Sequence, residues 1–445
     1  MRKFRFATAL LCAAVAVSDA SAMDLSLNDA VDMILDESQD LKKADANIKQ
    51  AEAQLDAVNA NRWFKIDGTA TYMNLIDMKN PTKSYSVSIP DEIGAALSQF
   101  TGGQPVPLPD KLDIPDSMFM AGVSVTQPIY TFGKIGNAVK AVKSAVKMAQ
   151  ASHEITMREV KYSAVDLYWT AKMTDEIVEI SRSDLQAARD ARRSLTSAGR
   201  ANRSNLVKIE SDIATKEINL SNAEFNRDTA HRMLKILAGI DINEELNLTD
   251  EFPDEFPDLN APELTSTPQW DALNEQIQMY ERNARSQRAN ALPTLAATAS
   301  YDYIAYGPNI PNMFGHDNMQ SAYWGLALQL PIFSGGANMA NATVQAMNAE
   351  AARQDLDKAK KMTNEEYTRA IDQYNHLRGN LATLKNARDL AAKAYDFSSG
   401  RFASGQTSAV ELAEVSAGLY QLDMALLQAK YNILMSAESV KKLGE

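Results

Sequence analysis

Two glutamates, Glu411 and Glu414, lie one helical turn apart in the stretch FASGQTSAVELAEV, beside Leu412 and Val415. Paired carboxylates at this spacing can attract cations or share a proton, and they can equally well keep the solvent face of a helix charged. A solvated helix flank is the more common role of such residues. Local sequence alone therefore assigns no chemical role to the two glutamates. Their role depends on the helices and strands that surround them.

Other residues capable of chemistry are too scattered to form a catalytic site. The four histidines, His153, His231, His316 and His376, are widely separated, and none belongs to an H-E-x-x-H arrangement. The FSGG sequence that begins at Phe333 lacks the Gly-Lys-Ser/Thr of a phosphate-binding loop and is more typical of a turn between a strand and a helix. The sequence predicts no enzyme, no catalytic residue, no metal site and no cofactor.

The first 22 residues have the features of a secretory signal peptide. Basic residues at positions 2, 3 and 5 precede the apolar run Phe6–Val17, and Ala20-Ser21-Ala22 follows. No later stretch approaches the length of about 18 apolar residues that a membrane-spanning helix needs. Cys12, the single cysteine, lies in this leader, so we expect an exported mature chain without disulfides or thiolate metal ligands.

Composition narrows the class further. The formal net charge is −12, and removing residues 1–22, which hold three basic residues and one acidic residue, makes it −14. This negative charge makes nucleic acid a poor partner. Aromatic residues make up only 7% of the chain and alanine is abundant, which suits long, closely packed helices better than one large globular core.

The chain contains the same plan twice. ANRWFKIDGTATY (60–72) aligns without gaps to ANALPTLAATASY (289–301), VTQPIYTFGK around Pro128 resembles LQLPIFSGGA around Pro331, and SAGRANRSNL around Gly199 resembles ASGQTSAVEL around Gly405. The spacing agrees too, because 71 residues separate Pro128 from Gly199 and 74 separate Pro331 from Gly405. We therefore expect two structural repeats, over residues 23–240 and 266–445.

The repeats are joined by an acidic, proline-rich linker over residues 241–265. Asp241–Leu264 holds nine acidic residues, three prolines and no lysine or arginine. We expect little regular structure there.

Each repeat also contains a long proline-free stretch, broken near Gly199 or Gly405. About sixty helical residues would form a rod about 90 Å long that turns back at the glycine. The second returning helix carries apolar or small residues in steps of three and four, at Leu412, Val415, Leu419, Leu422, Leu426, Ala429, Ile433, Ser436 and Val440. This heptad pattern predicts antiparallel coiled-coil packing, and the first copy is weaker because Lys216 interrupts it.

Between the helices, each repeat has two segments with the period of two that is typical of β-strands. We expect β-hairpins over about residues 63–130 and 293–333, with turns from strand to helix at Pro128, Gly133, Pro331 and Gly335. The strands of a soluble β-sandwich would also alternate between polar and apolar residues. Four strands in two separated hairpins cannot close a barrel alone, however, and an exported chain with an apolar strand face favours a lipid-facing barrel completed by other subunits.

The order of helix, hairpin, QPIYTFG or LPIFSGG, long helix, G-x-x-S-x-x-E-L turn and return helix resembles the TolC-like outer-membrane efflux proteins. The resemblance covers nearly all of the mature chain, and its specificity lies in the duplication more than in any single motif.

The resemblance implies an α+β membrane protein that forms a homotrimer in the outer membrane of a Gram-negative bacterium. Three protomers would build a 12-stranded β-barrel, continued by a periplasmic α-helical barrel. Such proteins are passive exit ducts of tripartite efflux or type I secretion systems, and they join an inner-membrane pump through a periplasmic adaptor. The adaptor would dock at the helical tips, which here hold Gly199, Arg200, Asn202, Gly405, Gln406 and Ser408.

This sequence departs from the family pattern in two places. Tyr72 to Pro128 spans 56 residues against 30 for Tyr301 to Pro331, and we expect the extra length to form a loop at the cell surface. Asn205 and Thr407 stand where relatives often carry an aspartate and an arginine, so a closing ion pair of that kind is not expected.

The resemblance also bears on the two glutamates. From Glu411 and Glu414 the same helix flank continues through Gly418, Gln421, Ala425, Gln428 and Asn432, a polar and small column that suits a water-filled lumen. Threefold symmetry would gather six carboxylates into two rings at the place where the family has acidic gate residues. Two carboxylates about 8 Å apart repel by about 2 kcal/mol at an effective dielectric near 20. We therefore hypothesise a cation-selective periplasmic gate.

Two alternatives stay open at this point. An exported coiled-coil adaptor or spacer would explain the helices and the acidic charge, but not four alternating strands placed symmetrically in two repeats. Within the duct hypothesis, drugs, metal ions and secreted proteins are all candidate cargoes, and the sequence does not separate them.

Overall fold

The computed structural model describes residues 23–74, 86–88, 90, 93, 111–113, 117–197, 203–259, 262–307 and 317–444. The chain divides into two compact units. The helical unit comprises Met1–Lys49, Met148–Leu273 and Gln354–Glu445, and the strand unit comprises Gln50–Lys147 and Asn274–Arg353. The expected signal peptide and most of the expected surface loop lie outside the described residues.

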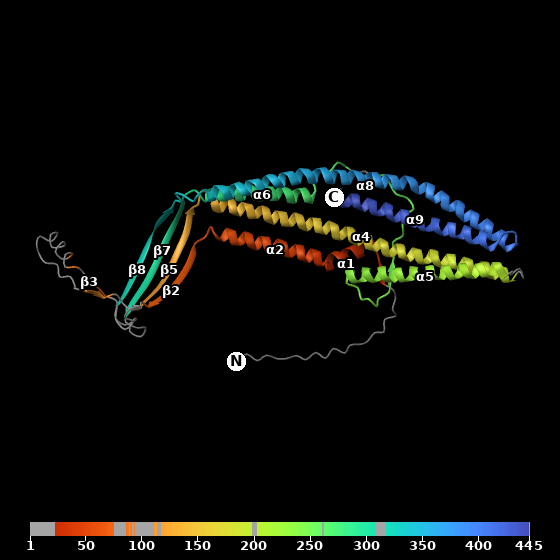
Figure 1. Cartoon of the computed structure of the whole chain (residues 1–445), viewed down its shortest axis with the longest axis horizontal. Coiled ribbons are helices and arrows are strands. Elements are labelled where there is room, and N and C mark those ends of the chain that lie inside the picture. Colours follow the sequence, from red (N-terminus) through yellow and green to blue (C-terminus); the bar gives the residue numbers. More distant parts are fainter. Residues whose placement is uncertain are drawn as a thin grey trace, which may run out of the picture. The chain divides into compact units, whose positions relative to one another are not determined.

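Most elements recur in the same order in the two repeats (Figure 1). In chain order the elements are β1 (Met23–Leu25), α1 (Leu27–Glu37), α2 (Gln39–Ala60), β2 (Lys65–Asn74), β3 (Ser86–Ser88), β4 (Lys111–Asp113), β5 (Ser117–Tyr130), α4 (Lys134–Ser197), α5 (Arg203–Ala238), β6 (Leu246–Leu248), α6 (Pro268–Ala289), β7 (Thr294–Gly307), β8 (Asp317–Gln329), α8 (Ala337–Ala403) and α9 (Ala409–Gly444). Of these, α1, β3 and β4 have no counterpart among the described elements of the second repeat. Equivalent helices have nearly equal lengths: 22 residues in α2 and α6, 64 and 67 in α4 and α8, and 36 in α5 and α9.

The strand unit contains an antiparallel sheet in the order β2-β5-β7-β8. Its register places Ile66 opposite Val125, Val125 opposite Ala299, and Ala299 opposite Trp324. Because side chains alternate along a strand, these residues share one face, and the row that begins with Lys65 and Thr126 lies on the other. The sheet therefore has one apolar face and one polar face.

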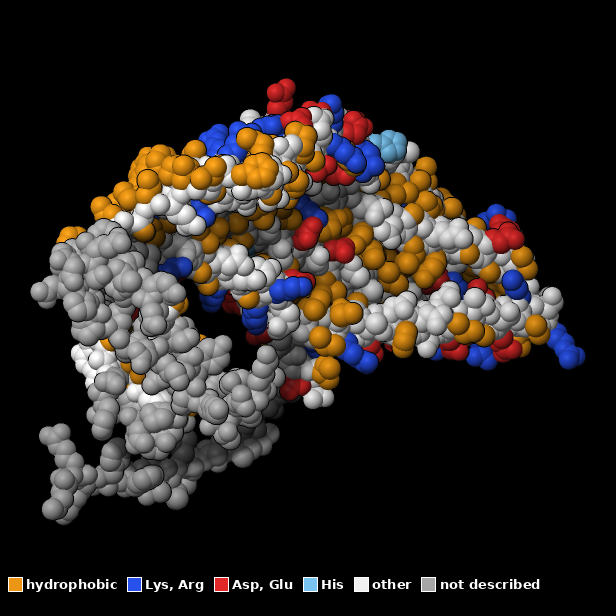
Figure 2. All heavy atoms as spheres, turned by 60° about the vertical axis from the view of Figure 1, so that its left-hand side comes forward, with side chains coloured by type: hydrophobic (Ala, Val, Ile, Leu, Met, Phe, Trp, Pro, Cys, Tyr) orange, Lys and Arg blue, Asp and Glu red, His pale blue; other side chains and the backbone are white. Residues whose placement is uncertain are grey.

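The apolar face and both edges of this sheet are uncovered. Ile66 is 61% exposed, Trp324 85% and Leu328 68%. Among the described residues, β2 and β8 each pair with only one strand, so each leaves a row of backbone donors and acceptors unpaired. Hydrophobic side chains are exposed over broad areas of the surface (Figure 2).

Inside the expected surface loop the structure describes one short ladder. Strand β3 pairs with β4 in antiparallel register, with Val87 opposite Leu112. The extra length of the first hairpin therefore contains some regular structure.

The helical unit shows why the heptad positions are apolar. In α9, Leu412, Ile433 and Val440 are buried. Other seam residues, including Leu419 and Leu426, are half-buried in the single chain. Helices α4 and α5 pack antiparallel, as the ion pairs Arg192–Glu210 and Arg182–Glu224 show. Helix α5 also contacts α9, which returns from the second tip in the same direction as α5. None of the helices in the described ranges is both long and apolar enough to cross a bilayer.

The largest core of the helical unit joins the two ends of the first repeat. Tyr168 and Leu234 are fully buried in it, together with Leu25 of β1 and Leu248 of β6. The Tyr168 hydroxyl lies 2.7 Å from Asp250 Oδ2 and 3.1 Å from the Leu25 carbonyl. Strands β1 and β6 are parallel, with Met23 opposite Leu246.

The described part of the linker has little regular structure, as expected, because β6 is its one short strand, and acidic side chains fix much of the remainder. Asp250 Oδ2 accepts a hydrogen bond from the N–H of Leu27, the first residue of α1 (2.7 Å). Lys430 Nζ donates to Asp254 Oδ1 (2.7 Å), and this hydrogen bond lowers the pKa of the Asp254 carboxyl. Arg378 pairs with Asp258. The acidic residues thus hold the linker against basic side chains of α8 and α9.

Buried tyrosines of this unit predict a loss of stability at alkaline pH. Burial is the main cause that raises the pKa of Tyr431 to about 12, and it also raises the pKa of Tyr168. Since the neutral phenol is favoured in the folded state, this stability is fully present below pH about 10, the pKa in the unfolded chain, and is lost as pH rises towards 12. Circular dichroism and tyrosinate absorbance should change together in that range. Tyr431→Phe should weaken the pH dependence, and an unchanged alkaline transition would contradict this prediction.

Candidate periplasmic gate and helical tips

Helix α8 ends at the second tip in a Schellman motif. Gly405 has a φ of 79°. Its N–H donates to the Phe402 carbonyl (2.9 Å), and the N–H of Gln406 donates to the Arg401 carbonyl (2.8 Å). Glycine adopts this left-handed conformation without the penalty that a Cβ causes. The chain therefore reverses at Gly405.

Ser408 caps the start of α9. Its Oγ accepts a hydrogen bond from the N–H of Glu411 (3.2 Å). The two residues have the S-x-x-E spacing of a capping box, and the helix dipole stabilises a carboxylate in the first turn. Arg401 Nη1 also lies 3.8 Å from Glu411 Oε1. Glu411 therefore supports the local fold of the tip in addition to any effect on ions.

Glu414 is the freer of the two predicted gate residues. It is exposed, and no ion pair or hydrogen bond holds its carboxylate within the described part of the chain. The predicted polar column continues along α9, with Gln421, Ala425 and Gln428 exposed and Gly418 and Asn432 half-buried. The column therefore lies on a surface of the helix, and the single chain leaves it open to water.

Both helical hairpins meet in one apolar cluster near the tips. It contains Leu195 of α4, Ile209 of α5, Phe402 of α8, and Ala409 and Leu412 of α9. This cluster fixes the start of α9, and with it Glu411, against the first repeat.

The predicted docking residues are only partly visible. Gln406 and Ser408 are exposed at the second tip. Gly199, Arg200 and Asn202 lie outside the described residues, so the role of the first tip stays a prediction. Thr407 Oγ1 is buried without a hydrogen-bond partner, so this position makes no polar side-chain link in the single chain.

Replacing Gly405 by valine should open the second tip and leave the strand unit intact. A left-handed φ costs a non-glycine residue about 1–2 kcal/mol, and more when the side chain is β-branched. Hydrogen exchange should therefore become faster around Phe402–Leu412, and adaptor-dependent export should fall.

The matched control is Gly400→Ala. Gly400 lies inside α8, and a Cβ added there meets no atom within 4 Å. Alanine is favoured over glycine in a helix by about 1 kcal/mol, so this variant should export normally. Wild-type exchange and export in Gly405→Val would show that the tip is misplaced.

The turns from strand to helix contain the expected glycines. Gly133 has a φ of 85° between β5 and α4. Gly335 and Gly336 have φ values of 60° and 80° between β8 and α8. Pro331 follows the end of β8 at Gln329.

The prediction of a turn at Pro128 was wrong. Pro128 lies inside β5 and pairs with Ala296 of β7. The register shifts between Pro128 and Tyr130. Proline has no N–H for the ladder, and a local irregularity accommodates the missing donor while the strand continues.

A buried ionic cluster is the main feature that sequence reasoning missed. Lys216 of α5 is 5% exposed, and its Nζ lies 2.5 Å from Asp184 Oδ1 of α4 and 3.1 Å from Ser416 Oγ of α9. The Ser416 hydroxyl donates to the same Asp184 oxygen (2.8 Å). The signal was the interruption of the heptad by Lys216, which marks a charged residue pointing into a helix interface.

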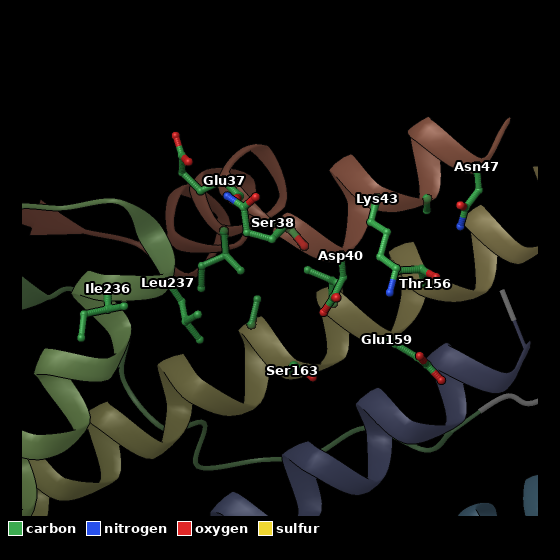
Figure 3. A pocket seen from close by; sticks show the side chains of 15 residues that line it. Glu37, Ser38, Asp40, Lys43, Asn47, Thr156, Glu159, Ser163, Ile236 and Leu237 are labelled. Atoms are coloured by element: carbon green, nitrogen blue, oxygen red, sulfur yellow. The ribbon is translucent and has the colours of Figure 1, made fainter. Parts of the chain in front are cut away.

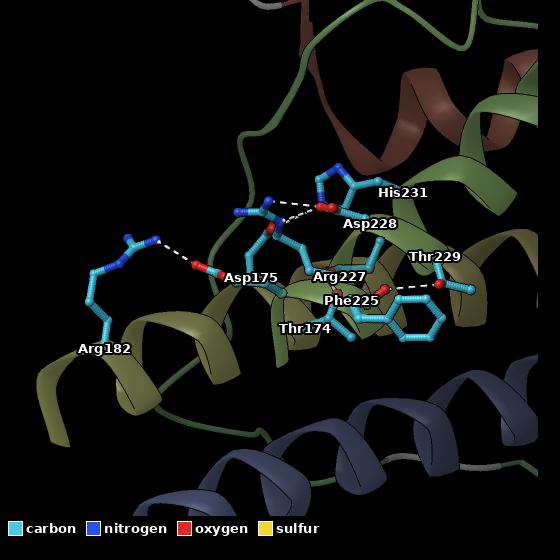
Figure 4. Close-up of polar contacts among 10 residues, drawn as sticks. Thr174, Asp175, Arg182, Phe225, Arg227, Asp228, Thr229 and His231 are labelled. Atoms are coloured by element: carbon cyan, nitrogen blue, oxygen red, sulfur yellow. Dashed lines mark hydrogen bonds and ion pairs between the residues drawn. The ribbon is translucent and has the colours of Figure 1, made fainter. Parts of the chain in front are cut away.

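Three of the four histidines have side-chain partners in the described part of the chain, and that of His376 is Asn380, with 3.2 Å between Nε2 and Nδ2. His231 Nε2 lies 2.9 Å from Asp175 Oδ1 and joins α5 to α4, close to the Arg227–Asp228 pair (Figure 4). His153 lies 3.3 Å from Asp45. His316 is outside the described residues. No group of three metal-binding side chains occurs among the described residues.

A surface groove of about 810 Å³ lies between α1 and α2 on one side and α4 and α5 on the other (Figure 3). Its lining mixes Glu37, Asp40 and Glu159 with Lys43 and several hydroxyls. It contains no histidine or cysteine.

One protein-family model matches most of the chain. The model of the outer membrane efflux protein family matches residues 30–239 and 263–443. The chain belongs to the outer membrane efflux protein family. The stretch between the two matches, residues 240–262, is most of the acidic linker.

Several known proteins are similar to this chain along most of their length. The alkaline protease secretion protein AprF of Pseudomonas aeruginosa is 19% identical over 327 residues, which are 71% of this chain and 67% of AprF. The crystal structure of the Campylobacter jejuni CmeC outer membrane channel has a TM-score of 0.75 at 19% identity and covers 94% of this chain and 85% of CmeC. The outer membrane protein VceC of Vibrio cholerae has a TM-score of 0.72 at 16% identity and covers 94% of this chain and 96% of VceC.

Membership of the outer membrane efflux protein family confirms the resemblance found in the sequence and the TolC-like fold. It also confirms an outer-membrane location with extension into the periplasm, and transport out of the cell as the general function. The family is one of channels, in agreement with the prediction that the chain is not an enzyme.

Proposed function

We propose that the chain is one third of a homotrimeric exit duct, which receives cargo from an inner-membrane pump and a periplasmic adaptor and releases it outside the cell. The observation that carries this proposal is the four-stranded sheet, with an apolar face and two open edges. Family membership supports the same function.

The sheet argues for assembly through its edges. In lipid, each unpaired backbone group costs several kcal/mol, so a sheet that ends at β2 and β8 is not stable in a membrane. Four strands are also fewer than the eight of the smallest bacterial outer-membrane barrels. If β8 of one protomer pairs with β2 of the next, three protomers close a 12-stranded barrel, with apolar residues outwards and polar residues inwards.

The helices offer matching contact surfaces. Val207, Ile218 and Phe225 of α5 are 58%, 62% and 71% exposed, at intervals of eleven and seven residues. Leu390 and Phe397 of α8 are 57% and 76% exposed, seven residues apart. Apolar residues at these intervals form a stripe along a helix, and such stripes pack against other helices. Contacts between protomers would cover them and continue the barrel as a ring of helices.

A secreted protein is one candidate cargo, because AprF is named for the secretion of a protease. Drugs and metal ions are the other candidates, because the family is named for efflux without a stated cargo. The helical tips at Gly405 and its counterpart Gly199 are the proposed docking sites of the adaptor.

Within this duct we propose that Glu411 and Glu414 form the periplasmic gate. Threefold symmetry would bring three copies of each carboxylate together near the tips. Arg401 offsets part of the charge of Glu411, so Glu414 should contribute more to cation attraction.

A direct test is the assembly state in membranes. The protein should fractionate with outer membranes, give a trimer mass in native mass spectrometry, and conduct ions in planar bilayers. A water-soluble protein without conductance would favour the non-channel spacer. A stable membrane monomer would contradict the closed barrel, because its two sheet edges would remain unpaired.

A further inference from the structure

We infer that a cavity in the strand unit is a binding site for amphipathic organic anions. The cavity measures about 470 Å³ and lies where strands β5 and β7 meet the ends of α2 and α4. This volume is in the range of about 300–1,000 Å³ that is typical of small-molecule sites.

The lining can hold an apolar body. Val58 of α2, Ile135 and Ala138 of α4, Pro128 of β5 and Ala296 of β7 contribute apolar surface. An apolar chain placed there would lose contact with water, which is favourable in proportion to the area buried.

Two lysines give the site its charge preference. Lys65 at the start of β2 and Lys134 at the start of α4 both line the cavity, and both are exposed. Within the described residues, neither ammonium group forms an ion pair. Asp67 lies two residues further along β2 but does not line the cavity. None of the lining residues carries a carboxylate. An apolar cavity with two unpaired cations and no carboxylate fits a ligand with an apolar body and an anionic head.

The cavity opens on the polar face of the sheet. Lys65 pairs with Thr126, and Pro128 pairs with Ala296, so these lining residues follow the polar row of the register. In the proposed duct this face points into the lumen, and the site therefore rests on the proposed function for its role. An amphipathic anion that moves along the duct would pause here, at the start of the barrel.

The test uses the trimer in nanodiscs of zwitterionic lipid, with decanoate as the probe and equilibrium dialysis as the readout. We expect one saturable site per protomer, with decanoate bound at least tenfold more tightly than decyltrimethylammonium. Lys65→Gln combined with Lys134→Gln should weaken decanoate binding at least tenfold. The matched control is Lys140→Gln combined with Lys143→Gln, which removes two exposed lysines of α4 outside the lining. It should leave the affinity for decanoate unchanged.

A second pair of variants tests the volume. Ala296→Leu fills the cavity and should weaken the binding of decanoate and of uncharged decanol alike, at least tenfold. Ala299→Leu adds the same bulk on the opposite face of β7 and should leave both affinities unchanged. Wild-type decanoate affinity in the double lysine variant or in Ala296→Leu would overturn the site.

Two further measurements are needed. One distinguishes a transported solute from a membrane lipid as the ligand, and the other tests the binding site separately from the proposed duct. Competition by phosphatidylglycerol in the nanodisc would overturn the assignment to a transported solute, because it would place the cavity in contact with the bilayer. Trimers that conduct ions but have no saturable decanoate site would overturn the site and leave the duct standing. Trimers that bind decanoate without conducting would retain the site and remove the duct.

Discussion

Lys216→Ala should lower the free energy of unfolding by about 3–5 kcal/mol, the usual cost of removing one partner of a buried ion pair. Lys216 is 5% exposed, and its loss would leave Asp184 charged inside the helix interface, with Ser416 as its remaining hydrogen-bond donor in the cluster. The cluster joins α4, α5 and α9, so thermal denaturation of the trimer, followed by circular dichroism, should show a large fall in Tm.

Two variants separate this effect from a general loss of charge. Lys161→Ala removes an exposed lysine of α4 and should change Tm little. Lys216→Met with Asp184→Leu replaces the closest buried pair by apolar residues of similar size, which is often neutral for stability. It should recover part of the loss, because Asp212, 4.0 Å from Lys216 Nζ, still loses its cation. A fall in the double variant equal to the sum of the two single variants would contradict the prediction, because it would mean that the pair is not coupled.

Glu411→Gln combined with Glu414→Gln should reduce the cation selectivity of the channel several-fold and remove block by multivalent cations added from the periplasmic side. Glutamine retains the capping-box geometry with Ser408, so the change removes charge while it preserves the start of α9. Planar-bilayer recordings under a salt gradient measure the effect as a shift in reversal potential. Of the two single variants, Glu414→Gln should reduce cation selectivity more than Glu411→Gln, because Arg401 lies beside Glu411.

The control for this experiment is Glu52→Gln combined with Asp56→Asn. These residues are exposed on one face of α2 and form no ion pair in the described structure, so the same two charges are removed elsewhere. Unchanged selectivity and block in the gate variant would return Glu411 and Glu414 to the role of a solvated helix flank.

Periodicity predicted most of this architecture. The heptad of α9 and the alternation in β5 and β7 depend on how side chains leave a helix or a strand, so they are visible in the sequence itself. Pro128 shows the limit, because the ladder tolerates a proline at a register shift that only the pairing with Ala296 reveals. The partners of Lys216 and Asp250 were also out of reach, since they come from helices far away in the sequence.

For the proposed gate, too, the sequence predicts the positions of the residues but not their contacts. The sequence places Glu411 and Glu414 one turn apart, but it does not reveal that Arg401 approaches the first of them. That contact depends on the reversal at Gly405, which brings the end of α8 beside the start of α9.

The pairing of β1 with β6 has a consequence for the order of events during folding. Met23 lies opposite Leu246, and the Leu27 N–H needs Asp250, 223 residues away. Contacts this distant in sequence form slowly, because a long loop has to close before they contribute any stability. An exported chain that emerges with its N-terminus first would therefore leave α1 undocked until the linker has followed it, so the first repeat cannot finish folding before the chain has reached the second.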